Sequence, residues 1–200
     1  MRSFFSPQNS RAIKILYRIL TAFLVVCWLL MALSAIGWCA VKKYVYPLEY
    51  KETVFYYADH YGLERGLIFS VIKTESSFDK NAVSGKGAMG LMQITAKTGE
   101  YIAQKLGLEN YDLLDAEDNV NFGCFYLKYL YLRFKDMDTA LVAYNAGEGN
   151  VALWLSEKSL SDDQKTLKII PFAESREYLK KIQQNFTKYK KLYGNILDKR

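Results

Sequence analysis

Residues 65–78 read RGLIFSVIKTESSF. Apolar side chains recur in this stretch at the spacing of one helix face; the stripe consists of Ile68, Val71 and Ile72 and continues with Glu75. The spacing predicts a helix over 65–78. Apolar neighbours and the negative end of a helix both raise the pKa of a carboxyl group, which suits a general acid. The alternative is a solvated glutamate without a chemical role.

Glycines punctuate the sequence that follows. Residues 84–93 read SGKGAMGLMQ, and Gly85, Gly87 and Gly90 match the Gly-x-Gly-x-x-Gly spacing of dinucleotide-binding loops. That motif has meaning only after a buried strand, and residues 78–84 (FDKNAVS) do not resemble one. We expect instead that the missing Cβ atoms let a bulky, hydroxyl-rich ligand approach the backbone.

The longest apolar stretch lies near the N-terminus. Residues 19–41 contain no charged side chain, and a helix of that length reaches roughly 35 Å, enough for a hydrocarbon core of about 30 Å. A cleaved signal peptide is the alternative, but its apolar core is usually only about 7–15 residues long, so we expect a retained anchor. Basic residues are more numerous before the stretch than directly after it, which favours a cytoplasmic N-terminus and an extracytoplasmic remainder.

The charge distribution argues against a nucleic-acid-binding protein. The formal net charge is +6, but the whole excess lies before residue 44, and residues 44–200 are formally neutral. A nucleic-acid-binding domain usually has a strongly basic surface. The lysines near the C-terminus are expected on a solvated helix face, with attraction to anionic wall polymers or lipid headgroups as the alternative.

Cysteine and histidine offer little catalytic chemistry. Cys27 and Cys39 belong to the apolar stretch, and Cys124 is alone in the remainder, so no disulfide can form there. Cys124 as a nucleophile would need His60, and we expect it to pack in the core instead. A single histidine disfavours the usual zinc ligand sets; we expect no metal and no cofactor.

Helical periodicity dominates after a connector at 42–50, which Pro47 interrupts. No alternating stretch indicates a large sheet, so the predicted fold class is mainly α. The predicted helices cover 49–61, 65–78, 90–105, 117–134, 138–146, 149–157 and 172–193. A polar stretch at 156–168 is expected to form a loop.

Several short tracts occur in a characteristic order. They are Glu75-Ser76-Ser77-Phe78, Gly87-Ala88-Met89-Gly90-Leu91-Met92-Gln93, Asn119 through Gly123-x-x-Tyr126-Leu127, Ala143-Tyr144-Asn145-Ala146-Gly147 and Glu174-Ser175-x-x-Tyr178. This ordered set resembles the lytic transglycosylases with a soluble-transglycosylase (SLT), goose-lysozyme-like domain, over roughly residues 50–190. The resemblance implies a lysozyme-like helical domain. The expected organisation is a basic cytoplasmic segment (1–18), a transmembrane anchor (19–41), a connector (42–50) and the transglycosylase domain (51–194).

The resemblance also implies the site residues. Glu75 matches the family's catalytic glutamate. The positions that match the glycan site or lie near it are Ser84, Gln93, Tyr144, Asn145 and Tyr178, and we add Met92 as the apolar residue most suited to contact substrate. Asn145 could instead cap its helix and Tyr178 could simply pack. The chain departs from the family pattern at Thr95-Ala96, where many relatives have an apolar residue and proline, and at Ser175, where threonine is frequent.

Family members cleave the β-1,4 bond between N-acetylmuramic acid and N-acetylglucosamine in peptidoglycan. A glycosidase normally needs two carboxyl groups, and the motifs nominate one. By resemblance, Glu75 protonates the glycosidic oxygen and then deprotonates the C6 hydroxyl of the muramic acid, which gives a 1,6-anhydro end. The alternatives are a lysozyme-type hydrolase, with Asp79 as the nearest second carboxylate, and a noncatalytic peptidoglycan-binding scaffold. The expected partners are glycan strands and the membrane.

Overall fold

The computed structural model describes residues 7–198 and divides into two units, Met1–Pro47 and Leu48–Arg200. The expected basic segment 1–18 and the basic C-terminal end lie partly outside the described residues. Each unit is built from its own contacts, and each is described by itself below.

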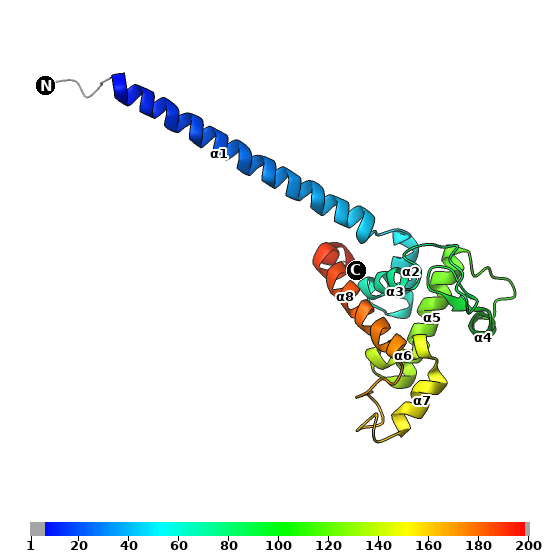
Figure 1. The fold of residues 1–200 in the computed structure, drawn as a ribbon. Coiled ribbons are helices and arrows are strands. Elements are labelled where there is room, and N and C mark those ends of the chain that lie inside the picture. Colours follow the sequence, from blue (N-terminus) through cyan, green and yellow to red (C-terminus); the bar gives the residue numbers. More distant parts are fainter. Residues whose placement is uncertain (1–6, 199–200) are drawn as a thin grey trace. The chain divides into compact units, whose positions relative to one another are not determined.

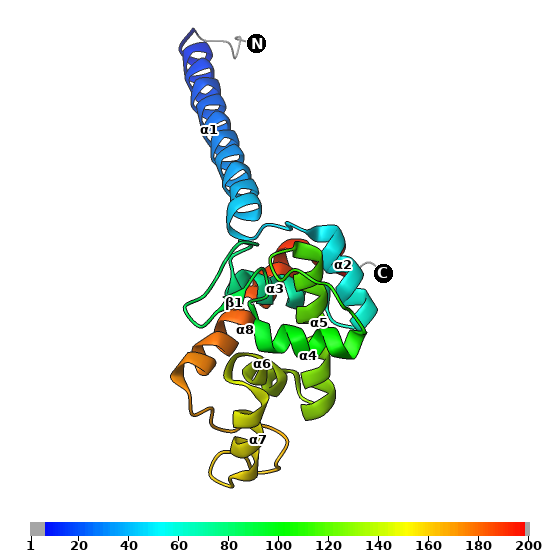
Figure 2. The same ribbon diagram turned by 90° about the vertical axis from the view of Figure 1, so that its right-hand side faces the viewer.

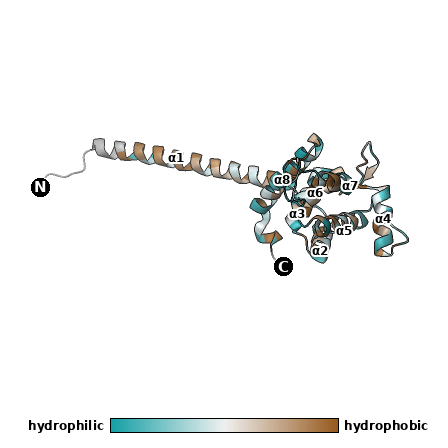
Figure 3. Cartoon of the chain, turned by 90° about the horizontal axis from the view of Figure 1, so that it is seen from below, coloured by the Kyte–Doolittle hydropathy of each residue, from teal (hydrophilic) through white to brown (hydrophobic). Residues whose placement is uncertain are grey.

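The first unit is one long helix, α1 (Pro7–Ala40), followed by a π-helical turn, η1 (Val41–Val45). Hydrophobic residues predominate along this helix (Figure 3). The segment Ile13–Val45, 33 residues, is long and apolar enough to cross a membrane by length and composition. It reaches about 50 Å at about 1.5 Å per residue, so it extends beyond the predicted 19–41 at both ends.

The second unit is mainly helical, which confirms the predicted fold class (Figures 1 and 2). Its elements in chain order are α2 (Lys51–Tyr61), α3 (Arg65–Glu75), β1 (Ala88–Met89), β2 (Ile94–Thr95), α4 (Ala96–Leu106), α5 (Ala116–Phe134), α6 (Met137–Ala146), α7 (Glu148–Ser156) and α8 (Ala173–Leu197). The strands form one antiparallel hairpin that pairs Ala88 with Thr95 and Met89 with Ile94.

Local sequence signals set most helix ends. Thr95, Asp115 and Asp136 cap α4, α5 and α6, because the side chain of each accepts hydrogen bonds from backbone N–H groups of the first turn. Gly62 and Gly107 end α2 and α4 in the left-handed conformation, with φ of 62° and 68°. Thr95 thus caps α4, and Ala96, at the position where many relatives have proline, is the first residue of the helix.

The core of the second unit lies where α3 packs along α8 (Figure 1); α6 packs on both α8 and α5, and α2 packs on both α3 and α5. The ring of Phe69 on α3 lies 5.5 Å from that of Tyr189 on α8 and 6.2 Å from that of Phe78. Side chains that are almost fully buried include Ile68, Ile72, Leu91, Ile102, Phe122, Leu127, Leu130 and Leu141. This packing holds the C-terminal end of α3 against the N-terminal half of α8.

The last predicted helix continues from residue 193 to Leu197, and two other predicted helix boundaries are wrong. The helix expected at 65–78 ends at Glu75, because Ser77 and Phe78 have φ of 52° and 71°. The helix expected at 90–105 begins only at Ala96, since residues 90–93 form the turn that joins β1 to β2. Both errors fall in segments where tertiary contacts override helical spacing.

Candidate active site

A groove of about 450 Å³ opens between the C-terminal end of α3, the loop at residues 84–87 (the glycine loop), the hairpin, the C-terminal end of α6 and the N-terminal end of α8. Its lining residues are Glu75, Ser84, Gly85, Lys86, Ala88, Gln93, Thr95, Tyr144, Asn145 and Glu174. Residues from four of the sequence tracts therefore meet around one cavity, although they are separated by up to about a hundred positions in the chain.

Glu75 is the last residue of α3, and its side chain is partly buried at the edge of this groove. Burial raises the pKa of its carboxyl group to about 7, although a hydrogen bond from Tyr178 acts in the opposite direction. The Tyr178 hydroxyl donates to Glu75 Oε1 over 2.6 Å, from the neighbouring helix α8. The carboxyl group can therefore hold a proton near neutral pH and still be held in one orientation.

Tyr178→Phe should move the pH dependence of any reaction that needs protonated Glu75. The lost hydrogen bond stabilises the carboxylate, so its removal raises the Glu75 pKa further and keeps the acid form present at higher pH. We expect the alkaline limb of the kcat/KM profile of that reaction to shift to higher pH. An alkaline limb that stays at the same pH, or moves to lower pH, contradicts the role given to the Tyr178 hydroxyl.

The buried side chain of Asn119, on α5, organises the floor of the groove. Its Oδ1 accepts from the backbone N–H of Met92 over 2.7 Å, and its Nδ2 donates to the carbonyl oxygens of Met89 and Leu113 over 2.9 and 2.8 Å. Gly90 lies against this amide with φ of 76°. The amide group thus determines the turn that carries Met92 and Gln93, and sequence reasoning assigned it no role.

Met92 differs from its expected role as a substrate contact. Its side chain is fully buried and packs so closely on Gly123 that a Cβ there would overlap it. Met92 contributes to the site through its backbone, because its carbonyl oxygen accepts from the Tyr144 hydroxyl over 2.8 Å. The sequence alone could not separate a core methionine from one that lines a groove.

Gln93 and Ser84 line the groove, and hydrogen bonds to the backbone hold both side chains. Gln93 Nε2 donates to the carbonyl oxygens of Ala82 and Gly90 over 3.1 and 2.9 Å. Ser84 Oγ accepts from the backbone N–H of Ala88 over 3.0 Å and closes the glycine loop. Both side chains are therefore positioned by the loop before any ligand binds.

Asn145, at the end of α6, is joined to α8. Ser175 Oγ donates to Asn145 Oδ1 over 2.6 Å, and Ser175 is almost fully buried. Serine supplies the same hydroxyl as the threonine that is frequent at this position in relatives, so this departure keeps the contact. Asn145 is thus held by a specific partner rather than serving as a helix cap.

A family model of the transglycosylase SLT domain matches residues 52–175. The chain belongs to the SLT family. This confirms the resemblance on which the site residues were assigned. The match includes the glutamate, the glycine loop and the tyrosine–asparagine tract, and ends at Ser175.

Relatives and solved structures agree with this assignment. The chain is 30% identical over 155 residues to the soluble lytic murein transglycosylase of Salmonella typhimurium, which covers 74% of the chain and 24% of the relative. It is 33% identical over 164 residues to membrane-bound lytic murein transglycosylase C of Serratia proteamaculans, covering 67% and 44%. An inactive mutant of the lytic transglycosylase Slt of Pseudomonas aeruginosa superposes with a TM-score of 0.64 at 29% identity, covering 73% of this chain and 24% of that one. The chain thus spans about a quarter of the length of the Salmonella relative.

The SLT domain places a second carboxyl group at the groove, but not the one suggested by the sequence. Asp79 is exposed, does not line the groove and accepts from the backbone N–H of Asn81 over 2.9 Å. Glu174 does line it and lies 3.6 Å from Lys86 Nζ, with side chains 72% and 85% exposed. An exposed ion pair of this kind contributes little stability and can open readily.

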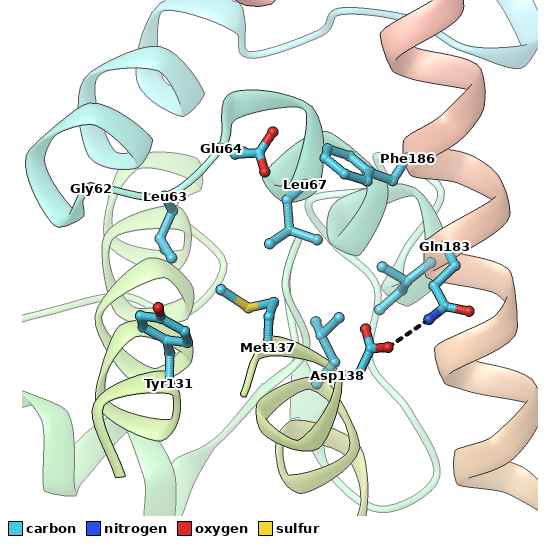
Figure 4. A pocket seen from close by; sticks show the side chains of 11 residues that line it. Gly62, Leu63, Glu64, Leu67, Tyr131, Met137, Asp138, Gln183 and Phe186 are labelled. Atoms are coloured by element: carbon cyan, nitrogen blue, oxygen red, sulfur yellow. Dashed lines mark hydrogen bonds between the residues drawn. The ribbon is translucent and has the colours of Figure 1, made fainter. Parts of the chain in front are cut away.

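A further cavity of about 410 Å³ in the SLT domain lacks these features (Figure 4). Its walls are mostly apolar, with Leu63, Leu67 and Met137 among them, and the hydrogen bond drawn there joins Gln183 Nε2 to Asp138 over 2.9 Å. It includes none of the site residues predicted from the sequence. We therefore place the candidate active site in the groove beside Glu75.

The other residues considered for a chemical role in the sequence, Cys124, His60 and the three glycines, have none of the surroundings that such a role needs. Cys124 is fully buried, which raises the pKa of its thiol and disfavours the nucleophilic form. His60 is exposed and contacts the rings of Tyr56 and Tyr61. The three glycines of the dinucleotide-like spacing lie in the loop and hairpin beside the groove, outside any strand–turn–helix unit of the described residues.

Proposed function

We propose that the protein is a membrane-anchored lytic transglycosylase that cleaves the β-1,4 bond between N-acetylmuramic acid and N-acetylglucosamine in peptidoglycan. The observation that carries this proposal is the partly buried Glu75, whose pKa is raised to about 7 beside a groove lined by hydrogen-bonding side chains. Membership of the SLT family and similarity to proteins named lytic murein transglycosylases support it.

The proposed reaction uses Glu75 twice. Protonated Glu75 gives its proton to the glycosidic oxygen as the bond from that oxygen to C1 of the muramic acid breaks. The resulting carboxylate, stabilised by the hydroxyl of Tyr178, then removes the proton of the C6 hydroxyl as its oxygen bonds to C1. The N-acetyl group of the sugar can assist at C1 between these steps. Acid and base are regenerated in each cycle, and no water is consumed.

A single proton-transfer group is sufficient for this route, whereas a hydrolase of lysozyme type needs a second carboxylate to attack or to activate water. Asp79 lies outside the groove lining. Glu174 lines the groove at an exposed position, where Oε2 lies 3.6 Å from Lys86 Nζ. Partly buried Glu75, taken together with membership of the SLT family, supports the transglycosylase route over hydrolysis.

Mass spectrometry of muropeptides released from purified wall tests the reaction. We expect products that end in 1,6-anhydro-N-acetylmuramic acid, because the attacking oxygen belongs to the sugar. Anhydro ends are lighter than hydrolytic reducing ends by one water, so the two products are distinguishable. Reducing ends without anhydro sugar would overturn the transglycosylase assignment and favour a hydrolase.

The anchor is the second part of the proposal. Segment Ile13–Val45 would hold the SLT domain at the extracytoplasmic surface of the membrane. The N-terminus would lie in the cytoplasm, because basic residues are more numerous before the apolar stretch than directly after it. Cleavage would then be confined to wall within reach of the connector. Resistance of the full chain to alkaline extraction from membranes, together with protease access to the SLT domain from outside, tests this topology.

A further inference from the structure

Four tyrosine rings form a continuous series of contacts that begins in the groove. Tyr144 lines the groove, and its ring centroid lies 5.6 Å from that of Tyr126. Tyr126 stacks on Tyr129 at 6.1 Å with 14° between the ring planes, and Tyr129 contacts Tyr101 at 5.8 Å. All four side chains are partly exposed. The series therefore leads from the site of Glu75 out to the surfaces of α4 and α5.

The outer end of this series is rich in hydrogen-bonding groups. The Tyr129 hydroxyl donates to Glu148 Oε2 over 3.1 Å, and Arg133 Nη1 donates to the same oxygen over 2.9 Å. The Arg133 and Glu148 side chains are 44% and 34% exposed. We call Tyr101, Tyr129, Arg133 and Glu148 the outer tyrosine cluster.

Two residues that line the groove are also joined to this cluster through the backbone. Thr95 caps α4, the helix that carries Tyr101. Asn145 precedes Glu148, at the start of α7, by three residues. A polymer that lies in the groove and continues past Tyr144 along the series of rings would meet the cluster.

The chemistry of the cluster suits a sugar. A pyranose ring has an apolar C–H face that packs on an aromatic ring, and hydroxyl groups at its edge that bond to planar charged side chains. An exposed Arg–Glu pair adds little to folding stability, so both side chains can turn to a ligand at the edge of the rings at little cost. Residues 44–200 are formally neutral, which gives no general attraction for a polyanion.

We propose that the outer tyrosine cluster is an additional saccharide subsite, which holds a sugar of the same glycan strand beyond those bound beside Glu75. This rests on the glycan substrate proposed above. The enzyme would then bind long strands more tightly than short ones, and the difference would depend on Tyr101 and Arg133.

The test uses the full chain with Glu75→Gln, so that binding is measured without cleavage, and peptide-free glycan strands of tetrasaccharide and octasaccharide length as probes. We expect Tyr101→Ala to weaken octasaccharide binding by about threefold to tenfold relative to tetrasaccharide binding, the range for one lost ring contact. Tyr101→Phe, which keeps the ring, should restore most of the difference. Arg133→Ala, an exposed position whose loss should not disturb folding, should reduce the same ratio by about threefold.

Tyr56→Ala is the matched control, because Tyr56 is an exposed tyrosine on α2 that lines no part of the groove. It should leave the ratio unchanged. Equal binding of both lengths, or a ratio that neither Tyr101→Ala nor Arg133→Ala alters, overturns the subsite. A wild-type protein that releases no anhydro ends from wall, yet shows the Tyr101-dependent ratio, contradicts the reaction and leaves the subsite intact.

Discussion

Glu75→Gln is expected to reduce glycan cleavage by about a thousandfold or more, within the range of about 10²–10⁴ that a general acid–base group contributes and with both halves of the cycle affected. Glutamine keeps the size of the side chain and can still accept the hydrogen bond from Tyr178, but it cannot transfer the proton. Binding to insoluble wall should persist, since the groove is otherwise intact. Release of soluble muropeptides and sedimentation with wall measure the two properties separately.

Asp79→Asn is the matched control for this substitution. Asp79 is exposed, lies close in sequence and has a side-chain oxygen that caps a turn, a contact that asparagine retains. We expect its cleavage rate to equal that of the wild type. Undiminished cleavage by Glu75→Gln would show that another residue is the acid, and a large loss in Asp79→Asn would support a two-carboxylate hydrolase.

The same Glu75→Gln protein should be more stable than the wild type above about pH 7. The folded-state pKa of about 7 lies above the ordinary value of 4.5, so the folded state retains a proton that the unfolded chain releases, and the wild type loses stability as pH rises between these values. At about 1.4 kcal/mol for each pH unit, the loss amounts to about 3 kcal/mol. The advantage of the variant in free energy of unfolding should disappear below about pH 4.5.

Gly90→Ala is expected to lower the free energy of unfolding by about 3–5 kcal/mol, which combines overpacking with a left-handed backbone at a residue that has a Cβ. A Cβ at Gly90 would overlap Asn119 Nδ2 and the carbonyl oxygen of Leu113. Neither atom can move away, because the two are hydrogen-bonded to each other over 2.8 Å. Urea unfolding of the detergent-solubilised protein measures the loss.

Gly87→Ala separates the two contributions. Gly87 has the same φ of 76°, but a Cβ there meets no atom within 4 Å. We therefore expect it to lose only about 1–2 kcal/mol, the cost of the left-handed conformation. Equal losses in the two variants would mean that contact with Asn119 is not what requires glycine at residue 90.

Helices with an uninterrupted apolar stripe and a capping residue could be predicted from the sequence. The helix predicted at 117–134 begins at Ala116 beside its cap Asp115 and ends at Phe134 as expected. Glu75 could be predicted because its own stripe and the ordered tracts indicated the same residue. Of the other residues that line the groove, the family resemblance predicted Ser84, Gln93, Tyr144 and Asn145.

Features that depend on contacts distant in sequence could not be predicted. The turn at 90–93 is imposed by Asn119, which lies 26 residues or more along the chain, so helical spacing there was misleading. A polar asparagine in the apolar face of the helix predicted at 117–134 was the available signal for its role. Nothing in the sequence indicated that Lys86 faces Glu174 or that Tyr101 meets Tyr129.

Two amide side chains that line the groove, Gln93 and Asn145, each make hydrogen bonds to the protein through one of their two polar groups. Both N–H groups of Gln93 Nε2 donate to carbonyl oxygens of the protein, so towards a ligand this amide can only accept; Asn145 accepts from Ser175 through its oxygen and has its NH₂ group to donate. The cavity therefore has a polarity: an occupant must present a donor to Gln93 and can present an acceptor to Asn145. On the proposed glycan strand a hydroxyl group can meet either amide, whereas an N-acetyl group can present its N–H only to Gln93, so this is the group whose orientation the cavity would select.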